Sequence, residues 1–156
     1  MHFPSKNSKE KVNKIDMLLN KSKEELIQII LEKEGYTVPV SVLNSGLHPL
    51  QAVVKYLCEK ENLDVKTISI LLNRNIQTIW TSYRLVKKKK LLFKESEIRI
   101  PLSVLSKTNY SILESTTHYL NNIHNMRLTE IAEILGKSIK TIWTCNNRYM
   151  IKGGKK

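Results

Sequence analysis

The stretch that decides the fold of this chain is Leu128-Thr-Glu-Ile-Ala-Glu-Ile-Leu-Gly-Lys-Ser-Ile-Lys-Thr-Ile-Trp-Thr-Cys-Asn-Asn-Arg148. Its first part predicts a short helix whose apolar face is formed by Leu128, Ile131 and Leu135. Gly136 can adopt the left-handed conformation that turns a chain sharply. Ser138 is a good N-cap for a following helix. The stretch therefore predicts two helices joined by a tight turn.

The second of these helices has an inward and an outward side. Ile142 and Cys145 form an inward pair, which leaves outward Lys140, Thr141, Trp143, Thr144 and Arg148. Ala132 is small enough to let the second helix cross close to the backbone of the first. A small residue, a glycine four residues later and an apolar residue six after that is the spacing of a DNA-binding helix-turn-helix.

This stretch is the second copy of an internal repeat. Seven residues recur at an offset of 63, namely Ile68, Leu72, Ile76, Thr78, Ile79, Trp80 and Thr81 as Ile131, Leu135, Ile139, Thr141, Ile142, Trp143 and Thr144. Upstream, Pro39-x-Ser-Val-Leu43 recurs as Pro101-x-Ser-Val-Leu105 at an offset of 62. A repeat of this size predicts a duplicated domain.

The first copy follows the same plan with different residues at the turn. Asn73 replaces Gly136, and asparagine tolerates the left-handed region better than most residues. Asn75 is the expected N-cap, and Ser69 stands where Ala132 is. Ile79 and Ser82 form the inward pair, which leaves outward Gln77, Thr78, Trp80, Thr81 and Arg84.

The pattern Leu128-Thr-Glu-Ile-Ala-x-x-Leu-Gly-x-Ser-x-x-Thr-Ile resembles region 4 of sigma-70-type factors and the related domains of response regulators. The two copies cover about two thirds of the chain. The resemblance implies tri- or tetrahelical domains whose last helix enters the DNA major groove. It places the base-reading positions on Ile76, Gln77, Thr78 and Thr81, and on Ile139, Lys140, Thr141 and Thr144. Region 4 usually carries several charged residues there, and no promoter-melting region precedes the repeats, so a complete sigma factor is not expected.

The chain is strongly basic, with 26 Lys and Arg against 14 Asp and Glu and a formal net charge of +12. A surplus of this size favours polyanionic partners such as nucleic acid or an acidic membrane surface. The first copy ends in the basic run Arg84-Leu-Val-Lys-Lys-Lys-Lys90, which is well placed for DNA phosphates. We expect phosphate contacts from Arg84, Lys87, Lys88, Lys89, Lys90, Lys140 and Arg148.

The chain has two tryptophans, Trp80 and Trp143, and they occupy the same repeat position. A core position is one interpretation, but Ile79 and Ile142 already hold the inward side, which favours DNA-facing tryptophans. Threonines are poor helix formers, yet each copy carries two in mid-helix. Their hydroxyls can bond phosphates or base edges, or can bond back to the helix. Ser138, at the start of the second helix, completes the expected DNA contacts.

We predict an all-α fold with two tandem helix-turn-helix domains after an N-terminal helical segment. The expected parts are residues 1–36 (helical segment), 37–90 (first repeat), 91–99 (linker), 100–152 (second repeat) and 153–156 (basic tail). We expect the chain to be mobile from Lys152, the last residue of the second repeat, onward. The linker is apolar at residues 91–93, so the repeats should pack together. The first helix of the second repeat has a weaker apolar stripe and predicts a poorer core.

Two local features leave alternatives open. The proline-containing segments Val38–Leu43 and Ile100–Leu105 begin extended. They either pair as two short strands or lie along the helices, and we expect the second arrangement. Residues 8–20 and 22–34 are helix-like, with a capping box at Ser22 and Glu25. They either pack onto the first repeat or form a homodimer.

These observations predict a double-stranded DNA-binding protein, a transcriptional regulator that reads related half-sites in one orientation. One alternative is an architectural protein that coats or bridges DNA in the manner of nucleoid or chromatin proteins. Another is an accessory subunit whose second repeat docks a protein. No residues assemble a catalytic, metal or cofactor site, and no apolar run is long enough to span a membrane. A cytoplasmic, nucleoid-associated protein is therefore expected.

Overall fold

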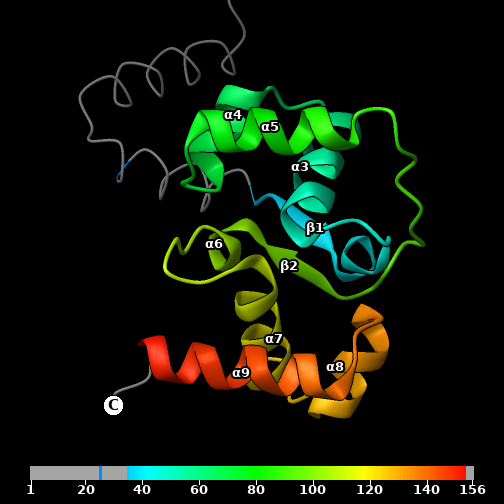
Figure 1. Ribbon diagram of the computed structural model, residues 1–156, viewed down its shortest axis with the longest axis vertical. Coiled ribbons are helices and arrows are strands. Elements are labelled where there is room, and N and C mark those ends of the chain that lie inside the picture. The colour runs from blue at the N-terminus through cyan, green and yellow to red at the C-terminus, as the bar shows by residue number, and fades with distance from the viewer. Residues whose placement is uncertain (1–24, 26–34, 154–156) are drawn as a thin grey trace, which may run out of the picture.

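The computed structural model describes residues 25 and 35–153 (Figure 1). The first repeat contains β1 (Thr37–Pro39), the 3-10 helix η1 (Val40–Asn44), α3 (Pro49–Glu59), α4 (Val65–Leu71) and α5 (Ile76–Val86). The second contains β2 (Arg99–Pro101), α6 (Leu102–Leu105), α7 (Ile112–Asn122), α8 (Leu128–Leu135) and α9 (Ile139–Gly153). The described part is thus mostly helical, with seven α-helices and one small sheet. Apart from Glu25, the predicted helices at 8–20 and 22–34 and their proposed dimer contact lie outside it.

The two proline-containing segments pair with each other as antiparallel strands. Val38 lies opposite Ile100, with Thr37 opposite Pro101 and Pro39 opposite Arg99. Both central residues are fully buried. The expectation that these segments lie along the helices was wrong, because pairing satisfies their backbone groups while it buries their apolar side chains. The prolines are tolerated because every strand of a two-stranded sheet is an edge strand.

The strand pairing relates the two repeats by an approximate twofold rotation. Val38 and Ile100 are equivalent residues, and they face each other at the centre of the ladder. Two hydrogen bonds beyond the strands are exchanged by the same rotation. Val40 N donates to Ile98 O, and its equivalent Leu102 N donates to Tyr36 O, both at 3.0 Å. In Figure 1, α5 and α9 lie at opposite ends of the long axis and run in opposite directions. The two helices are therefore antiparallel in this view, whereas half-sites read in one orientation would call for parallel helices.

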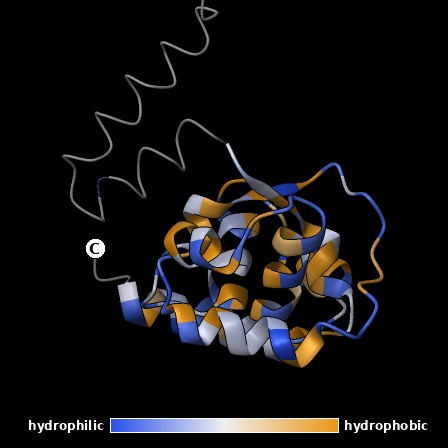
Figure 2. Ribbon diagram, turned by 90° about the horizontal axis from the view of Figure 1, so that it is seen from above, coloured by the Kyte–Doolittle hydropathy of each residue, from blue (hydrophilic) through white to orange (hydrophobic). Residues whose placement is uncertain are grey.

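One hydrophobic core serves both repeats. The cluster of buried apolar side chains contains residues of all the described helices and of both strands. Leu91, Phe93 and Ile98, from the predicted linker, pack against this core, which explains why that segment is apolar. Figure 2 shows the resulting amphipathic pattern, in which hydrophobic and hydrophilic residues alternate along the helices. The repeats therefore form a joint hydrophobic unit.

The first helices of the two repeats differ in the polarity of their buried sides. In α3, Pro49 occupies the first turn as expected, and Val53 and Val54 are fully buried. Their equivalents in α7 are Thr116 and Thr117, which are also fully buried. The Thr116 hydroxyl donates to Ile112 O at 2.8 Å, whereas the Thr117 hydroxyl has no hydrogen-bond partner. The buried side of α7 is thus more polar than that of α3, and the lower stability expected of the second repeat stays a prediction.

Helix α9 is fastened to α7 by contacts near its C-terminal end. Tyr149 stacks on His118 of α7, with ring centroids 3.8 Å apart, and on Tyr110, at 4.0 Å. Lys152 Nζ lies 2.9 Å from the buried carboxylate of Glu114. The prediction that Lys152 begins a free basic tail was wrong, because this residue lies in α9 and forms an ion pair. Residues 154–156 lie outside the described part.

Replacement of Thr117 by valine should stabilise the protein. Valine has nearly the same shape and removes a buried hydroxyl that has no partner, so we expect the free energy of unfolding to rise by about 1 kcal/mol. The matched control is Thr116→Val, which removes a hydroxyl that already has a hydrogen bond and should change stability less. Urea unfolding of both variants measures the difference. Equal effects of the two substitutions would contradict the prediction.

The stability of the protein should fall in mildly acidic solution because of His118. Burial and the charge of Lys107 lower the pKa of His118 below its ordinary value. The unfolded chain then binds this proton more tightly, so the free energy of unfolding should fall as the pH drops below about 6.5. His118→Phe keeps a ring for stacking and should flatten this dependence, whereas the control His124→Phe should retain it. Urea titrations at several pH values measure the free energy of unfolding. If this free energy falls with pH as steeply in His118→Phe as in the original chain, His118 is not the cause of the pH dependence.

Candidate nucleic-acid interface

The two helix pairs α4–α5 and α8–α9 are joined by turns of the same geometry. Asn73 has φ of +50° and Gly136 has φ of +62°, so both residues adopt the predicted left-handed conformation. The Asn75 side chain accepts a hydrogen bond from Gln77 N at 2.8 Å, and Ser138 Oγ accepts one from Thr141 N at 3.1 Å. The predicted turn residues and both predicted N-caps are thus confirmed.

The outward side of α5 presents its predicted residues to solvent. Ile79, Ser82 and Val86 are buried, and all the predicted contact residues of this repeat are exposed, namely Ile76, Gln77, Thr78, Trp80, Thr81, Arg84, Lys87, Lys88, Lys89 and Lys90. Trp80 is 49% exposed, which excludes a core position for it. The Arg84 guanidinium lies over the Trp80 ring, 4.9 Å from its centroid. A cation-π contact of this kind orients both side chains toward the same surface.

Helix α9 has the same inward pattern. Ile142 and Cys145 are buried, and Trp143 is 58% exposed. Ser138, Ile139, Lys140, Thr141 and Arg148 are exposed as well. Thr144 is half-buried, and its hydroxyl donates to Lys140 O at 2.8 Å. Thr144 therefore bonds back to its own helix here, which was the alternative interpretation of the mid-helix threonines.

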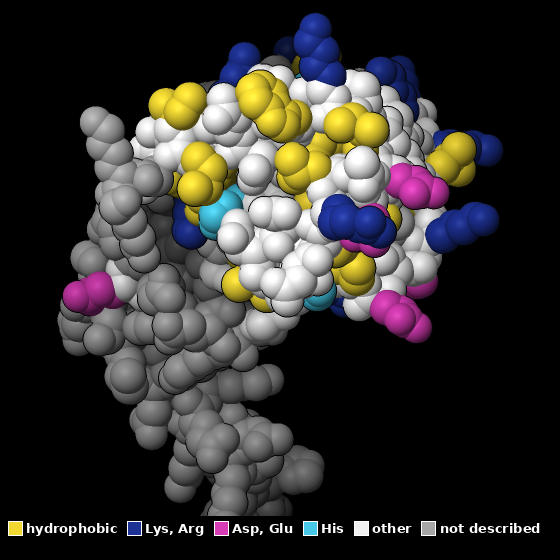
Figure 3. Space-filling view, turned by 90° about the horizontal axis from the view of Figure 1, so that it is seen from below, with side chains coloured by type: hydrophobic (Ala, Val, Ile, Leu, Met, Phe, Trp, Pro, Cys, Tyr) yellow, Lys and Arg dark blue, Asp and Glu magenta, His cyan; other side chains and the backbone are white. Residues whose placement is uncertain are grey.

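The outward sides of α5 and α9 differ in charge toward their C-terminal ends. Arg84, Lys87 and Lys88 in the first repeat correspond to Asn147, Met150 and Ile151 in the second. Met150 and Ile151 are exposed, as are Ile139 and Trp143 earlier in α9. Figure 3 views the molecule from the end that carries α8 and α9, and hydrophobic side chains are spread over this face. Toward its C-terminal end the first outward side is thus more basic, whereas the second carries two exposed apolar side chains there.

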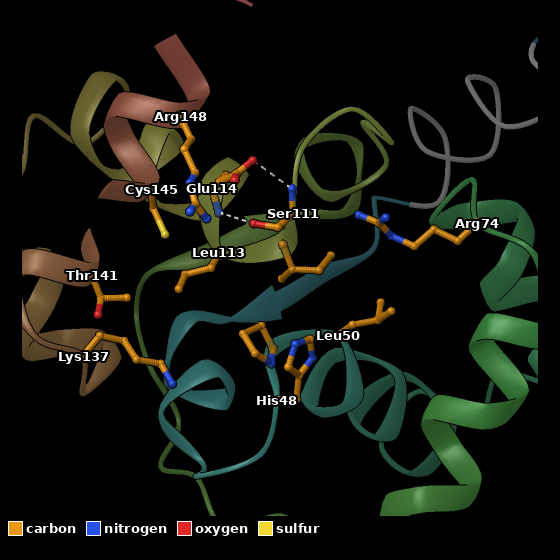
Figure 4. Close-up of a pocket in the computed structure, with 12 residues that line it drawn as sticks. His48, Leu50, Arg74, Ser111, Leu113, Glu114, Lys137, Thr141, Cys145 and Arg148 are labelled. Atoms are coloured by element: carbon orange, nitrogen blue, oxygen red, sulfur yellow. Dashed lines mark hydrogen bonds between the residues drawn. The ribbon is translucent and has the colours of Figure 1, made fainter. Parts of the chain in front are cut away.

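A cleft lies between the two repeats, with a cavity volume of about 530 Å³. The N-terminal ends of α3 and α7 and one flank of α9 form its walls (Figure 4). Three basic side chains, those of Arg74, Lys137 and Arg148, line it together with His48 and with the carboxylate of Glu114, which is paired with Lys152. Pro49, Leu50, Ile112 and Leu113 supply an apolar part of the lining. Such a lining favours an anionic group at the rim of the cleft.

Arg74 and Lys137 were not among the residues predicted from sequence. They occupy equivalent positions, each directly after the left-handed residue of its turn, and both line the cleft. The repeat alignment carried this signal, since a basic residue follows the turn in both copies. His48 also lines the cleft, but its position in the sequence carries no such signal. Among the positively charged residues predicted to contact DNA, Arg148 alone lines this cleft.

The guanidinium of Arg74 is partly removed from water without a carboxylate to balance it. Its Nη2 donates to Tyr110 O at 3.3 Å, while Nε is buried and has no partner. No ion pair joins Arg74 to an acidic residue in the described part of the chain. Burial lowers the pKa of Arg74, but arginine stays charged in proteins. A nearby phosphate would compensate this partly desolvated charge.

The described residues offer no arrangement typical of a metal centre. No three His, Cys, Asp or Glu side chains in that part of the chain lie close enough together to hold a metal ion. Cys58 and Cys145 are free thiols, and burial raises the pKa of Cys58 to about 11. A thiol of this kind is protonated at neutral pH and is a poor nucleophile or ligand. Among the helices of residues 35–153, none has the length and apolar character that would let it cross a bilayer.

Comparison of the chain with family models, curated proteins and solved structures finds no match. The resemblance to sigma-70 region 4 and response-regulator domains therefore stays a prediction.

Substitution of Gly136 tests the turn that positions α9. Gly136→Ala should lower the free energy of unfolding by about 1–2 kcal/mol, because an L-residue is strained in the left-handed region. This variant should lose more stability than the control Gly46→Ala, because Gly46 has φ of +83° but open space around an added Cβ. The added methyl at Gly136 would overlap the side-chain amide of Asn44. Urea unfolding compares the two variants, and equal losses would show that the contact with Asn44 has no energetic effect.

Proposed function

We propose that this protein binds double-stranded DNA through two helix-turn-helix units, with α5 and α9 as the recognition helices in the major groove. The observation that carries the proposal is the matched geometry of the two helix pairs. Each has a left-handed turn residue, a capped second helix and a buried isoleucine that turns the following tryptophan outward. Two units of this design in a chain of charge +12 favour DNA as the partner.

The exposed basic residues supply the nonspecific part of the binding. Lys87, Lys88, Lys89 and Lys90 continue from α5 and are all exposed. Arg84 is held over Trp80 and extends this basic surface along the helix. Lys140 and Arg148 give α9 a smaller basic surface. Contacts of lysine and arginine with phosphates release counterions, so the affinity should depend steeply on salt.

The residues at the start of each recognition helix suit contacts with base edges. Gln77 and Lys140 are exposed at equivalent positions, and exposed Thr78 and Thr141 follow them. Glutamine can form two hydrogen bonds with adenine, and lysine can donate hydrogen bonds to guanine. Threonine offers a hydroxyl for hydrogen bonds and a methyl for apolar contact. These polar side chains favour a sequence-reading regulator over an architectural protein. Selection of bound fragments from random duplex DNA decides between the two, because an architectural protein would enrich no motif.

A second candidate function follows from the apolar outward side of α9. Met150 and Ile151 are exposed where the first repeat carries Lys87 and Lys88, and Ile139 and Trp143 are exposed earlier in the same helix. Exposed apolar patches of this kind are typical of protein contacts. In this alternative α5 alone reads DNA, and α9 docks a protein as part of an accessory subunit.

Charge reversal on each recognition helix separates the two candidates. We expect Arg84→Glu with Lys87→Glu to weaken DNA binding and to lower the slope of log K against log salt by about 0.9 for each lost phosphate contact. Lys140→Glu with Arg148→Glu should do the same if α9 binds DNA. The matched control is Lys60→Glu with Lys94→Glu, which changes the charge equally at exposed positions outside both helices. Fluorescence anisotropy with labelled duplexes at several salt concentrations measures both quantities.

Each outcome of this comparison has a definite meaning. If only the substitutions in α5 weaken binding beyond the control, α9 does not read DNA and the docking function is favoured. If neither pair differs from the control, the chain does not bind DNA through these helices and the proposal is wrong.

A further inference from the structure

We propose that the DNA target is an inverted repeat whose two halves differ in sequence, so that the protein binds it in one orientation. This inference rests on the proposed DNA-binding function and specifies its substrate. It departs from the direct repeat that tandem domains predict. The repeats follow each other in sequence, but their orientation in space is set by the pairing of β1 with β2.

The relation between the recognition helices follows from the sheet. Because Val38 lies opposite its equivalent Ile100, rotation by about 180° exchanges the two strands. The same rotation exchanges the bond from Val40 N to Ile98 O with the bond from Leu102 N to Tyr36 O. Since α5 and α9 follow equivalent elements, the rotation exchanges them as well, and they run in opposite directions in Figure 1. Two reading elements related in this way fit two half-sites of inverted orientation.

The cleft between the repeats supplies a contact at the centre of such a target. Arg74 and Lys137 are equivalent residues, one from each repeat, and both line the same cleft. They come from different sides of this cleft in Figure 4, as a twofold relation requires. Arg74 is half-buried and forms no ion pair within the described part of the chain, which leaves its charge to be balanced by an anion such as a phosphate. We assign these two side chains to phosphates between the half-sites.

The difference between the half-sites arises at one pair of equivalent residues. Gln77 and Lys140 are both exposed near the start of their helices. The residues around them match, because Ile76, Thr78, Trp80 and Thr81 recur as Ile139, Thr141, Trp143 and Thr144. Glutamine favours adenine and lysine favours guanine in the major groove. The half-site under α5 should therefore carry adenine where the half-site under α9 carries guanine.

Selection from random duplex DNA with the full chain tests the arrangement directly. We expect two half-sites in inverted orientation, with centres about one helical turn apart, and with adenine and guanine at corresponding positions. An enriched direct repeat, or a single half-site, would overturn this inference and leave the DNA-binding function intact. Enrichment of no motif would overturn the inference together with sequence-specific reading, and absence of binding would overturn the proposed function itself.

The variant Gln77→Lys tests the residue assignment. It should turn the enriched motif into a symmetric inverted repeat with guanine in both halves, with a change of preference at that base on the order of ten-fold. The matched control is Gln51→Lys in α3, which adds the same charge outside the recognition helices and should keep the asymmetric motif. Circular dichroism of both variants checks whether they are folded. An unchanged motif in folded Gln77→Lys would exclude Gln77 as the residue that distinguishes the halves.

Discussion

The pairing of β1 with β2 is the constraint on which the rest of the structure depends. Each repeat alone spans roughly 55 residues, a size at which a hydrophobic core is marginal. The ladder buries Val38 and Ile100 at the boundary of the repeats, and the buried apolar side chains of both then form one cluster. Arg99 reinforces the contact, because its Nε donates to Thr37 Oγ1 at 2.7 Å and its Nη2 to the Tyr56 hydroxyl at 2.9 Å. The sheet thus supplies both shared stability and the twofold relation.

Because the two repeats share one core, the contacts that hold the recognition helix can differ between them. In the first repeat, Lys55 is buried in α3, and its Nζ bonds Glu59 and the carbonyl of Lys87 just after α5. In the second, His118 replaces Lys55 and stacks on Tyr149 of α9. In the first repeat a hydrogen bond from Lys55 holds the C-terminal end of α5, and in the second repeat the His118 ring stacks on a side chain in the last turns of α9. The two repeats therefore hold similar helices by different chemistry, one polar and one aromatic.

Much of the local structure could be predicted because the signals lie within a few residues of each other. Gly136, Asn73, Ser138 and Asn75 have conformational preferences that do not depend on distant contacts, and all four behave as expected. The strand pairing could not be predicted in this way, because it joins segments about 62 residues apart. Val38 and Ile100 show only that each segment is extended and apolar.

The candidate site likewise has a part that could be predicted from the sequence and a part that could not. Outward residues such as Trp80 and Trp143 follow from helical periodicity once Ile79 and Ile142 are known to point inward, and their exposure agrees. The cleft could not be predicted, because its walls come from helix ends that only the twofold arrangement brings together. Arg74 and Lys137 could have been found as a recurring basic position, but their common location depends on the strand pairing.

Covalent linkage of the two repeats has a consequence that a homodimer of one repeat could not achieve. A symmetric dimer presents identical residues to both halves of its target, so it cannot distinguish the two orientations of the DNA. In this chain the framework residues stay alike, whereas Gln77 corresponds to Lys140 and Arg84 corresponds to Asn147. The second contact is also intramolecular once the first has formed, so it needs no association of subunits. A duplicated chain can therefore keep the geometry of a dimer while each recognition helix acquires its own surface.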